Sequence, residues 1–540
     1  MQVREQEIQA HAADQTHTPQ PPDAIERDEI ISYDPATCLE IGRAPVATCE
    51  DVERAFSLAR AAQVEWRAKS YAERGQIILR ARQILLDETE EIAELISRET
   101  GKPIAEAVSM EIAPVLDLMR YFATETAKML RDEKINIGQY GLMRRRSRIR
   151  YLPLGVVGII SPWNFPLAIP LGEVVMALMA GNSVVLKPSE LTPLTGLKIK
   201  DLFTRAGLSD DLLHVLTGDG TTGAYLSESA VNKIMFTGSV ATGKRVALAA
   251  AKNLTPVVLE LGGKDPMIVF EDANLDIAAR AAVWGAFANA GQACASVERC
   301  YVHESVHDKF LKLVVKHTRA LQHGQQDSGT PDTDVGAMSS ERQLATVAAH
   351  VVEARARGAE ILTGGARGES VGAFYPPTVL DKVDHSMRIM REETFGPVLP
   401  VMTFDTDAKA IELANDSEFG LTASVWTKNI KRGERIAKQL EAGTVMVNEV
   451  LYTHGLAQTP WGGVKQSGRG RTHGRLGLLE LVEPQHIHIN SDTRLPDVWW
   501  FRYTPAAAKL FRGLAERFTT GSVLQTARLL PSMLRRLRER

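Results

Sequence analysis

The chain has 540 residues, an apolar fraction of 44%, a charged fraction of 24% and a formal net charge of −3. This length exceeds what one ordinary hydrophobic core holds, so it predicts two or three domains. A nearly neutral charge gives no reason to expect nucleic acid or another polyanion as a partner. The four cysteines are too few for a disulfide scaffold and lack zinc-ligand spacing, so we expect no metal site.

The N-terminal residues 1–27 are polar and charged where a secretory signal would be apolar, and they predict a disordered lead-in. No uninterrupted apolar stretch reaches the roughly 18 residues that would suggest a membrane-spanning helix. With no disulfide framework expected either, the sequence favours a cytoplasmic location.

Helical periodicity begins near Asp51, where apolar residues recur at intervals of three and four positions. A second amphipathic helix is predicted from Arg74 to Glu99, and Gly101 and Pro103 would end it. A third helix is predicted over 104–130. Residues 143–155 then alternate basic and apolar side chains, as in an exposed strand.

Short β-branched runs separated by helix-like segments follow, and this pattern predicts parallel sheets built from strand–helix–strand units. Four of these runs come before residue 264 and five come after it. The predicted strands lie in segments 155–161, 183–189, 233–239, 256–263, 266–270, 299–304, 398–404, 423–428 and 444–448. We therefore expect two α/β domains that meet near 261–266.

Cys294 lies among small residues in NAGQACASVER, where another molecule could approach its sulfur closely. A thiolate is a strong nucleophile for carbonyl carbon. A buried structural cysteine is the common alternative, and for Cys294 alone it would be favoured.

Two further residues have a chemical and a structural interpretation. Glu260 ends the apolar run PVVLEL, where scarce solvent would raise its pKa and suit a general base. A lone glutamate, however, more often turns back to solvent or to a lysine. Asn164 lies in a loop stiffened by prolines, so its amide could donate to an oxyanion or simply cap a turn.

Residues 238–244 match the G-x-x-x-x-G-K core of a nucleoside-triphosphate loop, but Arg245 stands where that motif needs Ser or Thr. We reject that interpretation and expect Gly238 and Ser239 to hold a dinucleotide phosphate at a helix N-terminus. The segment 218–220 is a weaker signal of the same kind. Lys187 and Glu190 follow a strand and predict either ribose contacts or a surface ion pair.

Taken in order, these segments resemble the aldehyde dehydrogenase superfamily from about Ile30 to Asn490. The resemblance depends on eight motifs in the expected order and spacing: GIISPWNFPL, VVLKPSELTP, FTGSVATGK, LELGGKDP, GQACASVER, EETFGPV, MVNE and PWGGVKQSGRGR. It implies a doubly wound, Rossmann-like cofactor domain, an α/β catalytic domain and a small β arm for oligomerisation.

The resemblance also implies a role for each site residue. Cys294 would attack the aldehyde, Asn164 and the Cys294 N–H would stabilise the oxyanion, and Glu260 would activate the hydrolytic water. NAD is the implied cofactor, with NADP as the alternative. Its predicted binding residues are Ser161, Trp163, Lys187, Glu190, Gly220, Gly238, Ser239, Leu261, Glu393 and Phe395. Because Glu260 is retained, we expect release of a carboxylic acid rather than transfer to coenzyme A.

Three positions depart from well-known members of the superfamily. Gly172 replaces a bulky aromatic residue beside the substrate tunnel, which implies a wider channel. Thr472 stands where a glutamate that relays protons is common. Glu190 favours NAD, because its carboxylate would repel the extra phosphate of NADP.

Residues 501–540 contain nine Lys or Arg against Glu516 and Glu539, with apolar residues between them. Such a basic amphipathic segment, with Trp499 and Trp500, could contact an anionic membrane through 499–540. It could equally pack on the catalytic domain with its arginines in water. The extension also resembles those of membrane-associated family members that act on fatty aldehydes. Together with Gly172, this resemblance implies a medium or long aliphatic aldehyde as the first expected substrate.

We expect the following domains: a lead-in at 1–27, a cofactor domain at 28–135 and 152–262, a catalytic domain at 263–469, an arm at 136–151 and 470–490, and an extension at 491–540. The arm predicts a homodimer or homotetramer. His486, His488 and the basic run 143–150 are assigned to this arm rather than to metal or nucleic acid. The alternatives are a succinate-semialdehyde dehydrogenase, for which Arg299 is not obviously placed, and a non-catalytic binding protein of the same fold.

Overall fold

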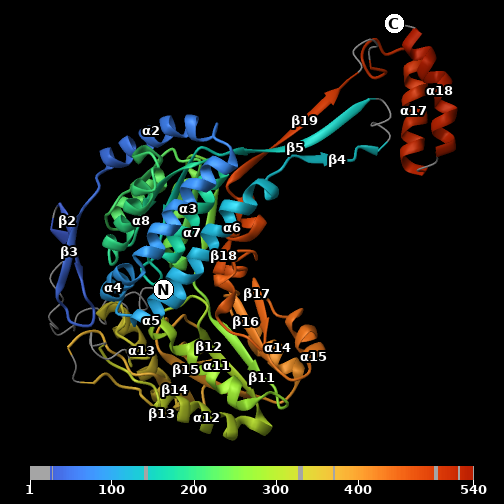
Figure 1. Cartoon of the computed structure of the whole chain (residues 1–540). Helices are drawn as coiled ribbons and strands as arrows, with labels where there is room; N and C mark the ends of the chain where they lie inside the picture. Colours follow the sequence, from blue (N-terminus) through green and yellow to red (C-terminus); the bar gives the residue numbers. More distant parts are fainter. Residues whose placement is uncertain are drawn as a thin grey trace, which may run out of the picture. The chain divides into compact units, whose positions relative to one another are not determined.

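The structure of the protein is a computed structural model (Figure 1), and it describes residues 25–26, 28–138, 144–325, 332–368, 371–491, 497–520 and 523–538. The chain divides into two compact units. Unit 1 comprises Met1–Met129 and Pro153–Glu483, and unit 2 comprises Leu130–Leu152 and Pro484–Arg540. The predicted lead-in lies outside the described residues, except for the two-residue strand β1 (Ile25–Glu26).

The first sheet of unit 1 has six strands in the order β18-β10-β9-β6-β7-β8. All of its strands are parallel except β18, which runs antiparallel to β10. The strands are β6 (Val156–Ile160), β7 (Ser183–Lys187), β8 (Leu213–Val215), β9 (Lys233–Thr237), β10 (Val257–Glu260) and β18 (Gly468–Arg469). From β6 the chain adds strands first on one side and then on the other, which is the doubly wound topology expected from the sequence.

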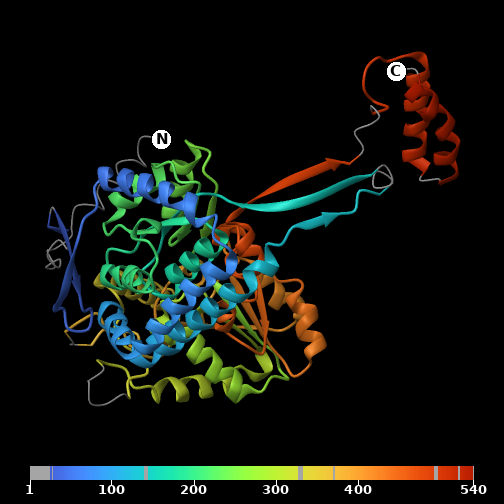
Figure 2. The ribbon, with the colours of Figure 1, turned by 45° about the horizontal axis from the view of Figure 1, so that its top comes forward.

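Helices cover this sheet because its central strands are apolar along their whole length and cannot face water. They are α2 (Cys49–Trp66), α7 (Ala168–Ala180), α8 (Pro193–Arg205), α9 (Gly220–Glu228) and α10 (Val240–Ala251). Three further helices pack beyond them: α3 (Tyr71–Asp87), α4 (Thr89–Thr100) and α6 (Ala113–Met129), with α3 beside α6 in Figures 1 and 2. All residues of α7 are buried, which fits its almost uniformly apolar sequence.

The second sheet has seven strands in the order β13-β14-β15-β12-β11-β16-β17, and it is parallel except between β13 and β14. Its strands are β11 (Asp265–Val269), β12 (Val297–His303), β13 (Glu360–Thr363), β14 (Thr378–Asp381), β15 (Val398–Phe404), β16 (Thr422–Trp426) and β17 (Thr444–Val447). Its helices are α11 (Leu275–Phe287), α12 (His307–Arg319), α13 (Glu341–Ala356), α14 (Asp407–Asn415) and α15 (Ile430–Ala437). Unit 1 also contains a small antiparallel sheet of β1, β2 (Glu29–Tyr33) and β3 (Glu40–Pro45).

All nine predicted strands of the two large sheets are confirmed, and two helix predictions are wrong in detail. The helix expected over 74–99 is broken, because α3 ends at Asp87 and α4 begins at Thr89. The helix expected over 104–130 begins with a short turn, α5 (Ile104–Glu106), and a π-helical segment, η1 (Ala107–Ile112), before α6. Apolar periodicity continues across such interruptions, so it does not reveal them.

Unit 2 combines a three-stranded sheet with a helical hairpin. The sheet has the order β19-β5-β4, with β4 (Glu133–Ile135), β5 (Arg145–Pro153) and β19 (Val482–Asn490). The hairpin consists of α17 (Pro505–Thr520) and α18 (Val523–Arg538), which lie side by side in Figures 1 and 2. The segment 470–481, predicted as part of the arm, belongs to unit 1 and contains the short helix α16 (Gly474–Leu479).

Candidate active site

The predicted phosphate- and ribose-binding residues lie at one edge of the six-stranded sheet. Ser161 follows β6 directly, Lys187 is the last residue of β7, and Gly238 and Ser239 follow β9. These strands are parallel neighbours, so their carboxyl ends meet at the same edge. The direction of strand addition reverses between β6 and β9, and doubly wound sheets bind ligands at such a reversal.

Lys187 and Ser161 are the buried polar residues at this edge of the sheet. The Lys187 ammonium lies 3.5 Å from the Glu190 carboxylate, with the lysine side chain 5% exposed and the glutamate 48% exposed. Burial lowers the pKa of Lys187, and the charge of Glu190 opposes this shift. The buried Ser161 hydroxyl has no hydrogen-bond partner in the described part of the chain, so a cofactor hydroxyl would satisfy it.

The start of α10 provides the predicted phosphate position. Ser239 caps this helix, and its hydroxyl accepts a hydrogen bond from Thr242 N at 3.3 Å. A Cβ at Gly238 would lie 2.7 Å from the Phe236 ring, so only glycine fits there. Gly220 begins α9 with open space on its side-chain face. These features fit a dinucleotide, whose phosphates the helix N-terminal amides would hold.

The nicotinamide end is predicted to lie near Glu393, Phe395, Trp163 and Leu261. Glu393 accepts a hydrogen bond from Gly263 N at 3.0 Å, and burial raises its pKa to about 8. The rings of Trp163 and Phe395 meet edge to face, with centroids 5.5 Å apart.

The loop that carries Glu393 and Phe395 is held by a buried ion pair that the sequence did not reveal. Glu298 accepts hydrogen bonds from the backbone N–H groups of Thr394 and Phe395, and its carboxylate pairs with the Lys264 ammonium. Glu298 lies in β12 and Lys264 directly precedes β11, so the pair anchors the loop to two strands of the second sheet. The candidate cofactor residues Glu393 and Phe395 are therefore rigidly supported.

Cys294 follows a tight backbone segment. Asn289 and Ala290 have φ angles of 54° and 52°, a left-handed conformation that is strained for residues with side chains. A Cβ at Gly291 would lie 2.2 Å from the Gly396 carbonyl oxygen, so this segment packs directly against the Glu393–Phe395 loop. The strained turn therefore brings the Cys294 thiol to the same region as the candidate nicotinamide residues.

Both the side chain and the backbone carbonyl of Asn164 are hydrogen-bonded. Its side-chain amide donates to the Gln292 carbonyl at 3.0 Å, and its backbone carbonyl accepts from the Lys102 ammonium at 2.8 Å and from Asn289 Nδ2 at 3.0 Å. Lys102 is itself paired with the buried Glu111 at 2.6 Å. An amide NH₂ group has two hydrogens, so one remains for a substrate oxygen once Gln292 has taken the other.

Cys294 and Glu260 line one small pocket. Its walls come from both large sheets and from α7. The lining residues are Ile169, Glu173, Thr237, Glu260, Leu261, Cys294, Leu421, His454, Trp461, Thr472 and His473. Neither carboxylate oxygen of Glu260 has a hydrogen-bond partner among the described residues.

The pocket changes the pKa of both reactive side chains in the same direction. Burial raises the pKa of Glu260 well above its usual value, Glu173 adds to the shift, and Arg471 opposes it. Burial also raises the pKa of the Cys294 thiol, with further contributions from the carboxylates of Asp265, Glu393 and Glu260. A protonated thiol is a weak nucleophile, so the Cys294 thiol must lose its proton, to solvent or to a base, before it attacks a carbonyl carbon.

Sequence reasoning missed three polar residues of this pocket: Glu173, His454 and His473. The rings of His454 and His473 meet edge to face at 4.8 Å, and burial lowers the pKa of His454 to about 4. Only Glu173 left a signal in the sequence, as the single charged residue in the apolar run 171–181.

A doubly wound nucleotide-binding edge beside a buried thiol and carboxylate defines the class: an α/β protein with the parts of a nucleotide-dependent dehydrogenase. A sequence model described as "Aldehyde dehydrogenase family" matches residues 23–487. The chain belongs to the aldehyde dehydrogenase family, and it is an enzyme that acts on aldehydes.

Three similar proteins illustrate the match. The chain is 41% identical to a 4,4'-diapolycopene aldehyde oxidase from Methylomonas sp, over 94% of this chain and 95% of that one. It is 40% identical to a putative NADP⁺-dependent succinate-semialdehyde dehydrogenase from Mycolicibacterium smegmatis, over 84% and 87%. An NAD⁺ complex of aldehyde dehydrogenase from Bacillus cereus superposes with a TM-score of 0.82 and 35% identity, over 86% and 94%.

These relatives support NAD as the cofactor and NADP as the alternative. The Methylomonas alignment has a further consequence. Because it covers 94% of this chain, it cannot stop at residue 487, where the family match ends, and must include part of the C-terminal segment.

Glu260→Gln tests the assignment of the base, because it keeps the shape of the side chain and removes its ability to take a proton. We expect one rapid burst of NADH per site, followed by steady turnover reduced by about 10²–10⁴-fold. In the wild type, kcat should rise with pH as Glu260 becomes ionised, since burial raises its pKa. Stopped-flow absorbance measures the burst and the later rate; full steady turnover in the variant would contradict the assignment.

Proposed function

We propose that this protein oxidises an aldehyde to its carboxylic acid through a covalent bond to Cys294. The observation that carries the proposal is the shared pocket of the Cys294 thiol and the Glu260 carboxylate. Attack of the thiolate on the aldehyde carbon gives a thiohemiacetal whose oxygen carries negative charge. The free hydrogen of the Asn164 amide and the Cys294 N–H stabilise that charge, and neither needs to be reordered because the Asn164 loop is fixed.

The dinucleotide, when bound, supplies the two-electron acceptor for the oxidation. The protein holds it with Lys187 and Glu190 at the adenosine ribose, with Gly238 and Ser239 at the phosphates, and with Glu393 and Phe395 at the nicotinamide ribose. Ser161, Trp163, Gly220 and Leu261 line the remaining parts of the site. Formation of a covalent adduct fixes the substrate against this site, which converts a collision into an oriented unimolecular step.

Glu260 then completes the reaction. Oxidation leaves a thioester on Cys294, and Glu260 takes a proton from the water that attacks the thioester carbon. The carbon–sulfur bond breaks, the acid leaves and the thiolate is restored. A carboxylate in a poorly solvated pocket is a stronger base than one in water, because burial disfavours its charged form.

The substrate is proposed to be a medium or long aliphatic aldehyde. Most of the surface that the pocket exposes is apolar, and its lining residues include no lysine or arginine. Burial keeps its two histidines neutral. A Cβ at Gly172 would lie 3.3 Å from Leu118 Cδ1 and 3.8 Å from His473 Nε2. The first of these contacts is already tight, so Leu118 fills the space beside Gly172 and the wider channel expected from the sequence is not found there.

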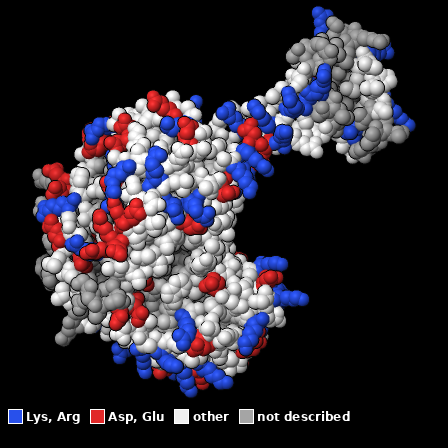
Figure 3. All heavy atoms as spheres, in the orientation of Figure 1, with Lys and Arg blue, Asp and Glu red and all other residues white. Residues whose placement is uncertain are grey.

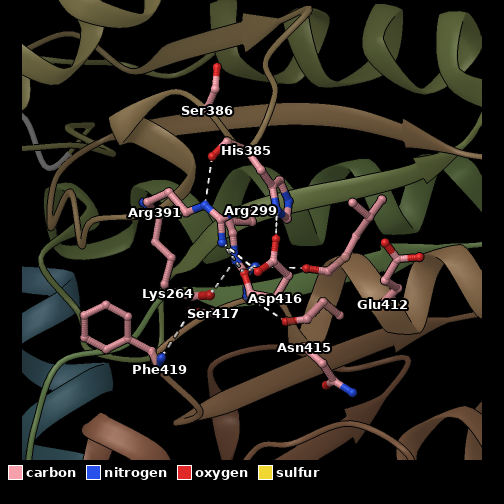
Figure 4. Close-up of polar contacts among 12 residues, drawn as sticks. Lys264, Arg299, His385, Ser386, Arg391, Glu412, Asn415, Asp416, Ser417 and Phe419 are labelled. Carbon is pink, nitrogen blue, oxygen red and sulfur yellow. Dashed lines mark hydrogen bonds and ion pairs between the residues drawn. The ribbon is translucent and has the colours of Figure 1, made fainter.

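A semialdehyde with its own carboxylate fits this site less well. Arg299, the nearest arginine in the sequence to Cys294, is 1% exposed and belongs to a different network. Its guanidinium donates to the carbonyls of Lys264, Leu413 and Ala414, at 2.8, 3.1 and 2.8 Å. Figure 4 shows this network around Asp416, where His385 and Arg391 also bind. Arg299 thus binds the C-terminal end of α14 instead of facing a substrate.

A panel of straight-chain aldehydes with NAD or NADP tests the reaction and its substrate class. We expect kcat/KM to rise with chain length, by roughly tenfold for each two or three methylene groups buried. Cys294→Ser should form no NADH with any aldehyde. A preference for succinate semialdehyde, or native turnover in Cys294→Ser, would contradict the proposal.

A homodimer or homotetramer is proposed from the arm strands. The sheet of β19, β5 and β4 has few buried side chains; β19 is exposed at most positions from Glu483 to Asn490. A three-stranded sheet without a covered face is not stable alone in water, and an exposed edge strand readily pairs with another chain. A second copy of the chain would supply that cover.

Light scattering coupled to size-exclusion chromatography measures the assembly directly. We expect a mass of two or four times 59.2 kDa at micromolar concentration. A stable monomer of 59.2 kDa with full activity would contradict this proposal.

We also propose that the C-terminal hairpin contacts anionic membranes. Trp500, Phe501 and Tyr503 are 58%, 78% and 65% exposed, and Leu530 and Leu534 are more than half exposed. Exposed basic residues accompany them on α17 and α18: Lys509, Arg512, Arg528 and Arg535. Figure 3 shows such basic side chains beside uncharged ones on the hairpin. Arg536 does not contribute, because it is buried and donates to the Trp500 carbonyl at 2.8 Å.

This contact would be peripheral, since no helix within the described ranges is long and apolar enough to cross a membrane.

Vesicle flotation of the full chain with phosphatidylglycerol vesicles and with phosphatidylcholine vesicles tests it. We expect binding to the anionic vesicles, and at least a tenfold loss in the charge-reversed variant Lys509→Glu, Arg512→Glu, Arg535→Glu. The matched control reverses three exposed lysines of unit 1: Lys428, Lys431 and Lys438. Equal binding of both variants, or no binding of the wild type, would contradict the proposal.

A further inference from the structure

Glu173 is a buried carboxyl that the proposed reaction has not yet used. It is the single charged residue of α7, and it is 4% exposed in a helix whose residues are all buried. Its Oε2 atom has no hydrogen-bond partner among the residues described. Placing a carboxyl in an apolar helix without a partner destabilises the fold, so its presence here requires an explanation.

Glu173 and Glu260 line the same pocket, and the charge of Glu173 contributes to the raised pKa of Glu260. The nearby cation that opposes this shift is Arg471, whose guanidinium donates to the carbonyls of Gly463 and Gly470 at 3.0 and 2.6 Å. One cation can balance one carboxylate. Two carboxyls that line one poorly solvated pocket disfavour each other's charge, so ionisation of one opposes ionisation of the other.

The other titratable groups that face this space are poor proton acceptors. His454 and His473 line the same pocket, and burial lowers the pKa of both, to about 4 for His454. Cys294 is occupied by the acyl group during hydrolysis. Thr237 and Thr472 offer only neutral hydroxyls. Glu173 is the other carboxyl among the lining residues. Burial raises its pKa to about 8, so the fraction of Glu173 that is ionised and able to accept a proton from Glu260 grows with pH.

We propose that Glu173 is a positioning residue for hydrolysis, which receives the proton that Glu260 takes from the attacking water. This inference rests on the proposed function. As the water oxygen bonds to the thioester carbon, its proton moves to Glu260 and the carbon–sulfur bond breaks, which leaves Cys294 as a thiolate. The proton then passes from Glu260 to the Glu173 carboxylate, so Glu260 regains its charge, and Glu173 releases the proton to bulk water before the next turnover. No electrons are transferred in this half of the reaction.

Glu173→Gln removes the acceptor with almost no change of shape. We expect an unchanged first burst of NADH and a steady-state kcat lowered by about tenfold or more, because only hydrolysis is slowed. Its pH profile should also move. Without the negative charge of Glu173, the pKa of Glu260 falls, so the acid limb of kcat shifts to lower pH.

Two further variants separate this role from a structural one. Thr472 lines the same pocket, so Thr472→Glu on the Glu173→Gln background returns a carboxylate there and should recover most of the lost rate. Glu99 is the matched control: it is equally buried, but its carboxylate accepts hydrogen bonds from Ser32, Leu194 and Thr195 outside the pocket. Glu99→Gln should lower thermal stability and leave the pH profile unchanged.

Hydrolysis of p-nitrophenyl acetate gives a readout that needs no cofactor, because the ester acylates the thiol directly. If wild type and Cys294→Ser hydrolyse the ester equally, the proposed function is wrong. If wild type depends on Cys294, and folded Glu173→Gln keeps the native rate and the native pH limb, Glu173 has no part in proton transfer. A slower hydrolysis phase with a shifted limb and recovery by Thr472→Glu supports the inference.

Discussion

Burial of the Glu260 carboxylate is the constraint on which the rest of the site depends. Its oxygens have no hydrogen-bond partner among the described residues, and burial raises its pKa well above the usual range. Such a group destabilises the fold and gains basic strength. The strand β10 holds it in place, because Gly238 donates to its backbone carbonyl and Gly468 of β18 pairs with it. The short strand β18 thereby forms the edge of the sheet at the residue proposed as the base.

The two large sheets contribute different parts of one site. The six-stranded sheet presents Lys187 and Ser239 at its carboxyl edge, as expected for a dinucleotide. The seven-stranded sheet supports the strained turn before Cys294 and the loop of Glu393, which the buried Lys264–Glu298 pair fixes. The strained turn and the buried ion pair therefore position the sulfur of the proposed nucleophile, Cys294, and both features lower the stability of the fold.

Much of the fold was predictable from the sequence, because β-branched runs bounded by glycine and proline mark buried parallel strands reliably. The breaks after Asp87 and within 107–112 were not, since local distortions leave apolar periodicity intact. Among site residues, Cys294 and Glu260 were found through motifs, and the structure brings them to one pocket. Glu298, His454 and His473 gave no signal, because their roles depend on contacts between segments that are distant in the chain.

Mass spectrometry of the acyl intermediate is the most direct measurement of the central claim, that Cys294 forms a covalent bond to the substrate. The enzyme is mixed with a long-chain aldehyde and NAD, quenched in acid and digested. We expect the acyl group on the peptide that contains Cys294, at higher occupancy in Glu260→Gln and absent from Cys294→Ser. An acyl group on Cys300 or another residue, or turnover with no adduct in Glu260→Gln, would contradict the account.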